Sequence, residues 1–299
     1  MEIKSVLVPT DFSLPSRLAV NYGVSVARKF RSRLTLAHVL EPASRRSHGK
    51  STTGAKKGTQ RREEAIRELW AVLAPEDQDD LDLRVVLKEG SADKEIAAIV
   101  EQERPDVVIL GTHGHGRIGR LIIGSTTEHL LRTLTVPMLT VSNVVRPMAF
   151  ERILFATDLS EAAHHGFTFA LDLARTLQAE LVVLHCMEVP PGKGDSAAQA
   201  RDMALEEARR KLGRLAAEGK FHNVKIQTIL TEGMPGGQIL KAADESMADF
   251  ILMGVKSKNV VERALVGTTA AHVVREARVP VLAVPVHQAA HPEAEPRSR

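Results

Sequence analysis

Short apolar runs alternate with amphipathic segments along the whole chain. Between positions 14 and 30, apolar residues from Leu18 to Phe30 recur every three or four positions, the period of an amphipathic helix. Apolar runs of strand length lie on either side of this segment. Such alternation predicts an α/β fold, in which helices cover both faces of a parallel sheet. In the first half the predicted strands are 3–8, 34–40, 83–87, 106–110 and 137–141, and the predicted helices are 14–30, 60–73, 92–103 and 127–134.

The segment after the second predicted strand has a different composition. Residues 41–59 are polar, basic and rich in Ser and Gly, which predicts a solvated loop. The helix that follows has an apolar face, and we expect Trp70 to lie on that face in the core.

The same pattern repeats in the second half. Residues 152–160 have the character of residues 5–13, and Asp158 follows Asp11 by 147 residues. Further along, the spacing becomes 143, which relates Gly254 to Gly111. Two registers, each held over many residues, indicate a duplicated domain with a net shortening between them. The predicted layout is a first domain at 1–145, a junction near 142–150, a second domain at 150–287 with a helix at 199–217 and strands at 224–230 and 280–284, and a disordered tail at 288–299.

A glycine-rich stretch follows the predicted strand 106–110 and ends where the next helix begins. Glycine lets the backbone approach an anion closely, and the N–H groups at a helix start attract negative charge. A strand, a glycine loop and a helix start therefore predict a phosphate-binding loop, and we hypothesise that it binds a nucleotide. The candidate residues are Gly111, Thr112, His113, Gly114, His115, Gly116, Arg117, Gly124, Ser125 and Thr126.

Other interpretations of these glycines fit less well. Residues 114–119 match G-x-G-x-x-G, but that fingerprint belongs in the first strand–helix turn of a domain, and here it follows the fourth strand. A Walker loop needs a glycine where Ser44 stands, before residues 49–51. A simple turn, with Ser125 and Glu128 as a capping box, explains the helix start but not the glycine spacing.

Composition narrows the remaining classes of function. The net charge of +3 is too small to indicate nucleic acid, and 3% aromatic residues offer few stacking platforms. A single cysteine, Cys186, excludes an internal disulfide framework and favours a reducing compartment. The N-terminus lacks a signal-peptide pattern, and no apolar run reaches the length of a membrane span. We therefore expect a cytoplasmic protein without nucleic-acid or membrane partners.

The loop spacing resembles that of a known family. Gly111, Gly114 and Gly124-Ser125 match the complete motif G-x2-G-x9-G-[S/T] of the ATP-binding subgroup of universal stress proteins. The resemblance covers roughly residues 1–142 and 150–287, as in the tandem type of the family. It implies two doubly wound domains, adenine nucleotide alpha hydrolase-like, each a parallel sheet of five strands in the order 3-2-1-4-5. Strands 1 and 4 are then neighbours at a switch point, where ligands bind beyond the carboxyl ends.

The resemblance also assigns residues at the base end of the nucleotide. It implies that Asp11 lies at the adenine and ribose side and that the backbone at Val39 contacts adenine, with Pro9 and Thr10 lining the same turn. Asp11 could instead cap the following helix, although Ser13 is better placed to do so. The implied ligand is ATP, with Mg²⁺. The resemblance further implies that the fifth strands pair between the two domains as a pseudo-dimer; homodimerisation remains open.

The second half departs from the motif. Ser257 stands where the second glycine belongs, and Cys186 replaces the equivalent of Val39, whereas Gly267-Thr268 is intact. We therefore expect the first half to bind ATP and the second to bind weakly or to serve as a structural partner. His113 and His115 suggest a metal site, but no third ligand can be named, so no metal is predicted.

No catalytic arrangement can be recognised in the sequence, which contains no triad spacing and no metal-ligand cluster. The prediction is therefore a nucleotide-dependent stress-response or regulatory protein with an unidentified protein partner, by analogy with the family. Two alternatives stay open. One is a slow ATP-hydrolysing enzyme of the same fold, because positioning and charge stabilisation do most of phosphoryl transfer. The other is an interaction module with an empty loop.

Overall fold

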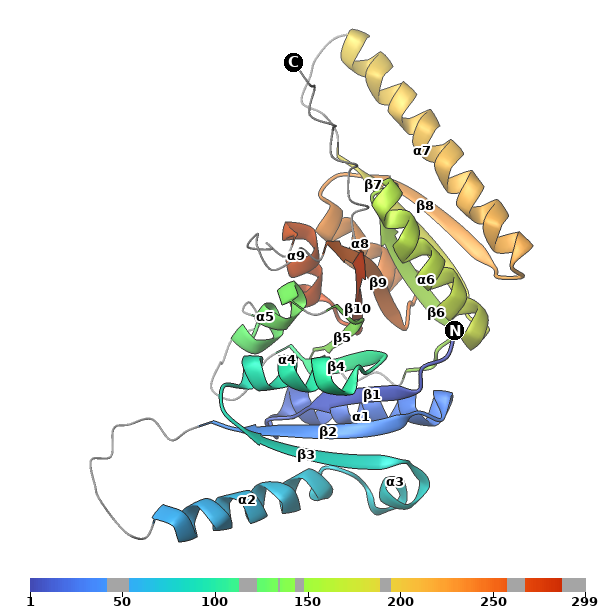
Figure 1. Cartoon of the computed structure of the whole chain (residues 1–299). Coiled ribbons are helices and arrows are strands. Elements are labelled where there is room, and N and C mark those ends of the chain that lie inside the picture. The colour runs from blue at the N-terminus through green and yellow to red at the C-terminus, as the bar shows by residue number, and fades with distance from the viewer. Residues whose placement is uncertain are drawn as a thin grey trace, which may run out of the picture.

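One ten-stranded sheet runs through the part of the chain that the computed structural model describes, namely residues 1–41, 54–112, 123–133, 135–142, 148–188, 195–256 and 267–286 (Figure 1). Its order is β3-β2-β1-β4-β5-β10-β9-β6-β7-β8, so each half has the order 3-2-1-4-5 that the resemblance implies. Pairing is parallel within each half. The strands are β1 Ser5–Pro9, β2 Arg33–Leu40, β3 Leu83–Glu89, β4 Val107–Gly111, β5 Met138–Val141, β6 Arg152–Thr157, β7 Glu180–Met187, β8 Ile226–Glu232, β9 Phe250–Lys256 and β10 Val281–Val286.

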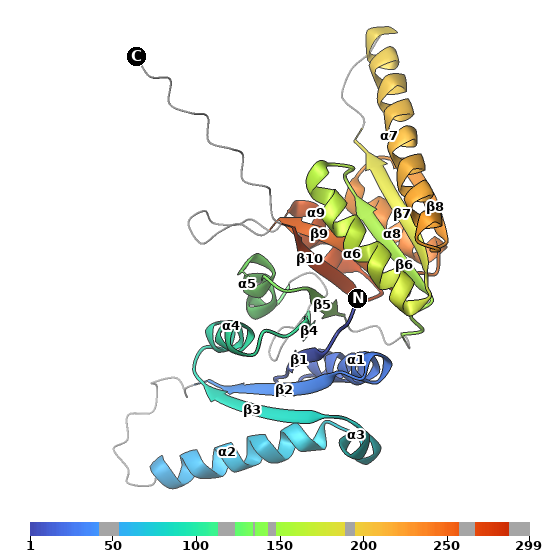
Figure 2. The same ribbon diagram turned by 45° about the vertical axis from the view of Figure 1, so that its right-hand side comes forward.

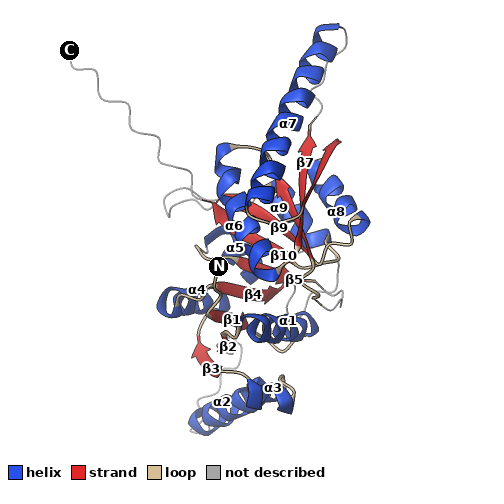
Figure 3. Ribbon diagram, turned by 90° about the vertical axis from the view of Figure 1, so that its right-hand side faces the viewer, coloured by secondary structure: helices blue, strands red, loops and turns tan. Residues whose placement is uncertain are grey.

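Helices cover both faces of the sheet (Figure 3). The first two long helices of each half, α1, α2, α6 and α7, pack on one face in a single apolar core, and α4, α5, α8 and α9 pack on the other. The first turns of α2 and α7 extend past the strands that they cover (Figure 2). The helices are α1 Leu14–Phe30, α2 Gly54–Ala71, α3 Pro75–Asp80, α4 Ala92–Glu103, α5 Ser125–Thr133, α6 Glu161–Leu177, α7 Asp195–Phe221, α8 Pro235–Glu245 and α9 Thr268–Glu276.

Two predictions around α2 are wrong. The helix begins at Gly54, inside the segment predicted as a loop, and Trp70 is 40% exposed rather than in the core. The buried side of α2 instead carries Ala65 and Leu69, which are spaced by four residues, and Leu73 just beyond the helix is buried as well. Trp70 follows Leu69 by one position, a rotation of about 100° around the helix, and so it lies on the flank of the helix, partly exposed to solvent. The predicted tail, 288–299, lies outside the described residues.

A carboxylate at the amino edge of each half fixes the pairing of the first strand with the fourth. Asp106 Oδ2 accepts hydrogen bonds from the backbone N–H groups of Lys4 and Ser5 at 2.7 and 2.9 Å. The equivalent Asp249 accepts bonds from residues 151 and 152 at 2.7 and 2.8 Å. Because β1 and β4 are held in register at this edge, their carboxyl ends also lie side by side.

The two halves join where β5 and β10 pair antiparallel, as the resemblance implies. Leu139 lies opposite Leu282, and these residues occupy equivalent positions 143 apart. Beside them, the Thr140 hydroxyl donates to the Val281 carbonyl at 3.2 Å. A pair of equivalent residues facing each other places a pseudo-twofold axis between them, as in an isologous dimer interface. Each of these strands thereby covers what would otherwise be an open sheet edge.

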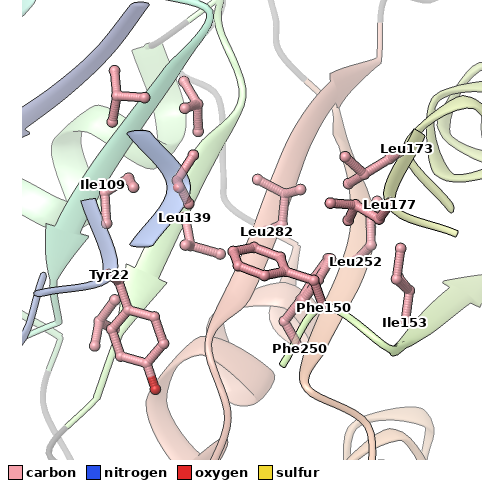
Figure 4. Close-up of a cluster of buried hydrophobic side chains, with 14 of the residues drawn as sticks. Tyr22, Ile109, Leu139, Phe150, Ile153, Leu173, Leu177, Phe250, Leu252 and Leu282 are labelled. Carbon is pink, nitrogen blue, oxygen red and sulfur yellow. The ribbon is translucent and has the colours of Figure 1, made fainter. Parts of the chain in front are cut away.

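A cavity of about 40 Å³ lies close to this axis, and all its lining side chains are apolar. Figure 4 shows side chains of both halves, Leu139, Leu282 and Phe150 among them, gathered there. In several equivalent pairs that line the cavity, the first half contributes the smaller side chain. These pairs are Ile3 with Phe150, Val26 with Leu173, and Val107 with Phe250.

Filling this cavity should stabilise the protein. Val26→Leu reproduces the residue at the equivalent position, Leu173, and 40 Å³ of cavity corresponds to about 1 kcal/mol at roughly 24 cal/mol per Å³. We expect the free energy of unfolding, measured by denaturant titration, to rise by about 1 kcal/mol. The control is Val20→Leu, on the same helix but in close-packed surroundings, which should lower it by about 1–3 kcal/mol. A loss of stability in both variants would contradict the prediction.

Candidate functional site

A cleft of about 440 Å³ opens at the carboxyl edge of the first half, where β1 and β4 lie side by side. This is the switch point of the sheet, at which open α/β folds bind ligands. The structure brings most of the described candidate residues together there. Its lining includes Pro9, Thr10, Asp11, Val39, Gly111, Gly124, Ser125 and Thr126.

Of the described candidates, Thr112 alone is not among the residues that line the cleft. Thr112 is buried, and its backbone binds Val141 and Gly124 instead of facing the cleft. His113, Gly114, His115, Gly116 and Arg117 lie outside the described residues and stay predictions from the sequence.

The turn after β1 holds Asp11 by short-range hydrogen bonds. Phe12 has φ 65°, and its N–H donates to the Thr10 hydroxyl at 3.1 Å. The Asp11 carboxylate accepts the N–H and the hydroxyl of Ser13, at 3.1 and 2.5 Å. His38, on β2, contacts the Thr10 carbonyl through Nδ1 at 2.7 Å, and its ring lies against Phe12. Asp11 therefore binds Ser13 at the entrance of α1, and Ser13 occupies the N-cap position of the helix without a capping hydrogen bond from its side chain.

The two described ends of the glycine loop are tied to each other. The Gly124 N–H donates to the Thr112 carbonyl at 2.9 Å, and the Thr127 hydroxyl donates to the Gly111 carbonyl at 3.0 Å. A Cβ on Gly111 would lie 2.7 Å from the backbone carbon of Pro15. Close packing of α1 against β4 thus accounts for this first glycine without a ligand.

The start of α5 forms the opposite wall of the cleft. The helix begins at Ser125, and the Glu128 N–H donates to the Gly124 carbonyl at 2.9 Å. The Glu128 carboxylate pairs with Arg132, so the capping box is not formed. The first N–H groups of a helix have no partner within it, and they carry its positive dipole end. The α5 start can therefore receive an anion.

Sequence reasoning missed several residues that line the cleft. Ser16, buried in the first turn of α1, and His38 both lie there. Arg61 reaches the rim from α2 and donates to the Glu41 carbonyl at 2.9 Å. For Ser16, the only signal in the sequence was its spacing of three residues from Ser13. Arg61 was inside the predicted helix 60–73, but the sequence did not show that this helix reaches the cleft.

The second half repeats the turn but not all of its contacts. Leu159 has φ 57° and donates to the Thr157 hydroxyl at 3.0 Å, and His185 contacts the Thr157 carbonyl at 2.9 Å. Cys186 points its thiol at the Gly233 carbonyl, 3.3 Å away. Burial, with a smaller contribution from Glu188, raises the pKa of this thiol, so it is a poor nucleophile at neutral pH. Ser257, expected to weaken binding here, lies outside the described residues.

Two further findings concern the described residues only. No three of their His, Cys, Asp and Glu side chains are grouped so that they could hold a metal ion. None of their helices has the length and apolar character that crossing a membrane requires.

Sheet order, duplication and cleft position define a tandem doubly wound α/β protein with a cleft at the switch point of its first half. A sequence profile of the Universal stress protein family matches residues 2–142 and 149–285, and the chain belongs to this family as a tandem member. A universal stress protein of Methanocaldococcus jannaschii is 31% identical over 142 residues, which covers 45% of this chain and 82% of that protein. One from Mycolicibacterium smegmatis is 24% identical over 292 residues, 93% of this chain and 96% of that one.

A solved structure shares the whole tandem fold. The crystal structure of a universal stress protein from Archaeoglobus fulgidus superposes with a TM-score of 0.67 at 22% identity, covering 94% of this chain and 97% of that chain. The duplicated architecture predicted from the repeat is therefore confirmed.

The packing role of Gly111 can be tested by substitution. In Gly111→Ala the added methyl meets the Pro15 backbone, which cannot rotate away, and we expect a loss of about 1–3 kcal/mol in unfolding free energy. The matched control is Gly213→Ala in α7, where nothing lies within 4 Å of the new methyl; it should gain about 0.5–1 kcal/mol. Equal effects of the two changes in denaturant titrations would show that no close approach constrains position 111.

Proposed function

We propose that the first half binds ATP, together with Mg²⁺, and that the protein acts as a nucleotide-dependent regulator in a stress response. The observation that carries this proposal is that Asp11 and the start of α5 face one cleft of about 440 Å³. A carboxylate that accepts hydroxyl hydrogen bonds and a helix start that attracts anions suit the two ends of a nucleotide. The family membership supports the same ligand class.

Each part of the cleft then has a role. The backbone N–H groups at Ser125 and Thr126, with the residues 113–117 predicted from the sequence, hold the phosphates, and Gly124 lines the cleft beside them. Asp11 accepts a hydrogen bond from a ribose hydroxyl, and the backbone at Val39 contacts the adenine edge. Mg²⁺, when bound with ATP, supplies neutralisation of the phosphate charge.

The second half serves as the structural partner in this proposal. It keeps the turn at Asp158 but has Cys186 in place of Val39 and Ser257 in place of the second glycine. The regulatory output passes to a protein partner that distinguishes the nucleotide-bound from the nucleotide-free form. Because β5 is already paired with β10, a homodimer of the whole chain would use another surface.

A titration of the full chain with ATP and Mg²⁺ tests the proposal. Asp11→Ala removes a charged hydrogen-bond acceptor from the cleft, so ATP affinity should fall about tenfold or more. Asp158→Ala makes the same change at the equivalent position of the second half and should leave the affinity unchanged. Mass spectrometry of the purified protein is expected to find a co-purified adenine nucleotide. Failure of the wild-type chain to bind ATP, or equal losses in both variants, would refute the proposal.

A further inference from the structure

The turns that follow β1 and β6 have the same backbone. Ser13 and Ser160, which precede the first helix of each half, have φ/ψ of −65°/161° and −73°/163°. In both turns the preceding residue has a positive φ. Both turns are also held by a histidine on the neighbouring strand, His38 or His185. Any functional difference between these turns therefore arises from their side chains.

The two serine hydroxyls differ in their partners. Ser160 Oγ accepts a hydrogen bond from the Ala163 N–H at 3.2 Å and so caps α6. Ser13 Oγ makes no such bond to α1. It donates instead to Asp11 Oδ1 at 2.5 Å. In the first half the hydroxyl that normally caps a helix is thus used to hold the carboxylate of the cleft.

The residue three positions further on explains this difference. Ser16 occupies the place of Ala163, is only 5% exposed, and donates its hydroxyl to the Ser13 carbonyl at 3.0 Å. The same oxygen lies 3.0 Å from Thr10 Oγ1 and 3.3 Å from Ser13 Oγ. The contact between the two serine hydroxyls thus accompanies the Ser13 rotamer that points toward Asp11. Ala163 has no hydroxyl, so Ser160 caps its helix.

We propose that Ser16 is a positioning residue of the nucleotide cleft: through Ser13 it orients the Asp11 carboxylate, and its absence from the second half leaves Asp158 without this support. This inference rests on the proposed binding of ATP by the first half. Ser16 is not part of the glycine motif, because it lies in the helix that follows the first strand. It would therefore be a further residue on which nucleotide affinity depends.

The test combines ATP titration with crystal structures of variants of the full chain. Ser16→Ala should lower ATP affinity about tenfold, the scale of one hydrogen bond to a charged group. Its unfolding free energy should be unchanged or higher, because Ser13 can then cap α1. The control is Ser25→Ala on the same helix, whose hydroxyl bonds only the Asn21 carbonyl at 2.9 Å; it should bind ATP like the wild type.

Structures of the variants separate this inference from the proposed function. In Ser16→Ala, Ser13 Oγ should turn from Asp11 to the N–H of residue 16. The reverse change, Ala163→Ser, should turn Ser160 Oγ toward Asp158, although Ala162 remains where the first half has Pro15. Unchanged serine rotamers in both variants would overturn the inference whether or not ATP binds. Wild-type affinity in Ser16→Ala would also overturn it, whereas a wild-type chain that binds no nucleotide refutes only the proposed function.

Discussion

The pairing of β1 with β4 is the contact on which the cleft depends. Asp106 fixes this pairing at the amino edge by accepting two backbone N–H groups of the incoming first strand. At the other edge, Gly111 allows α1 to approach β4 so closely that no side chain fits between them. These two constraints bring the turn containing Asp11 and the start of α5 to opposite walls of one cleft. The position of the cleft is therefore set by backbone geometry, and its chemistry by the side chains placed around it.

Duplication explains why the same constraints occur twice with different outcomes. Both halves have an aspartate that binds the start of the first strand, a positive-φ residue in the turn after that strand, and a histidine that contacts this turn. These features therefore belong to the fold. Differences in a hydroxyl and a thiol involve positions that line the cleft in the first half, namely Ser16 against Ala163 and Val39 against Cys186. Comparing equivalent positions of the two halves thus distinguishes residues that stabilise the shared fold from residues that change the properties of one cleft.

Much of the architecture could be predicted because hydrophobic periodicity reports directly on burial. The helices 14–30 and 92–103 were predicted with the bounds that the structure has. The short helix α3 was missed because Pro75–Asp80 has no apolar period at all. Trp70 was misplaced because a bulky apolar residue can lie one position away from the buried stripe and still resemble a core residue.

The residues of the candidate site that belong to short sequence motifs could be predicted. Gly124 and Ser125 follow from the glycine spacing and Asp11 from the family resemblance, and all three line one cleft. Ser16 and Arg61 line the same cleft through contacts that depend on how helices pack, which local spacing does not encode. Gly111 has a packing role that its motif position did not reveal: it lines the cleft, and the close approach of α1 also requires a glycine there.

The junction of β5 with β10 also determines how the protein behaves on dilution. Two separate subunits that met along these strands would come apart at low concentration, and their association would shift with expression level. In this chain the covalent linker makes the encounter intramolecular, at an effective concentration set by linker length. Every molecule therefore carries one copy of each half at any cellular abundance, and the halves are free to diverge without the risk of pairing two identical copies.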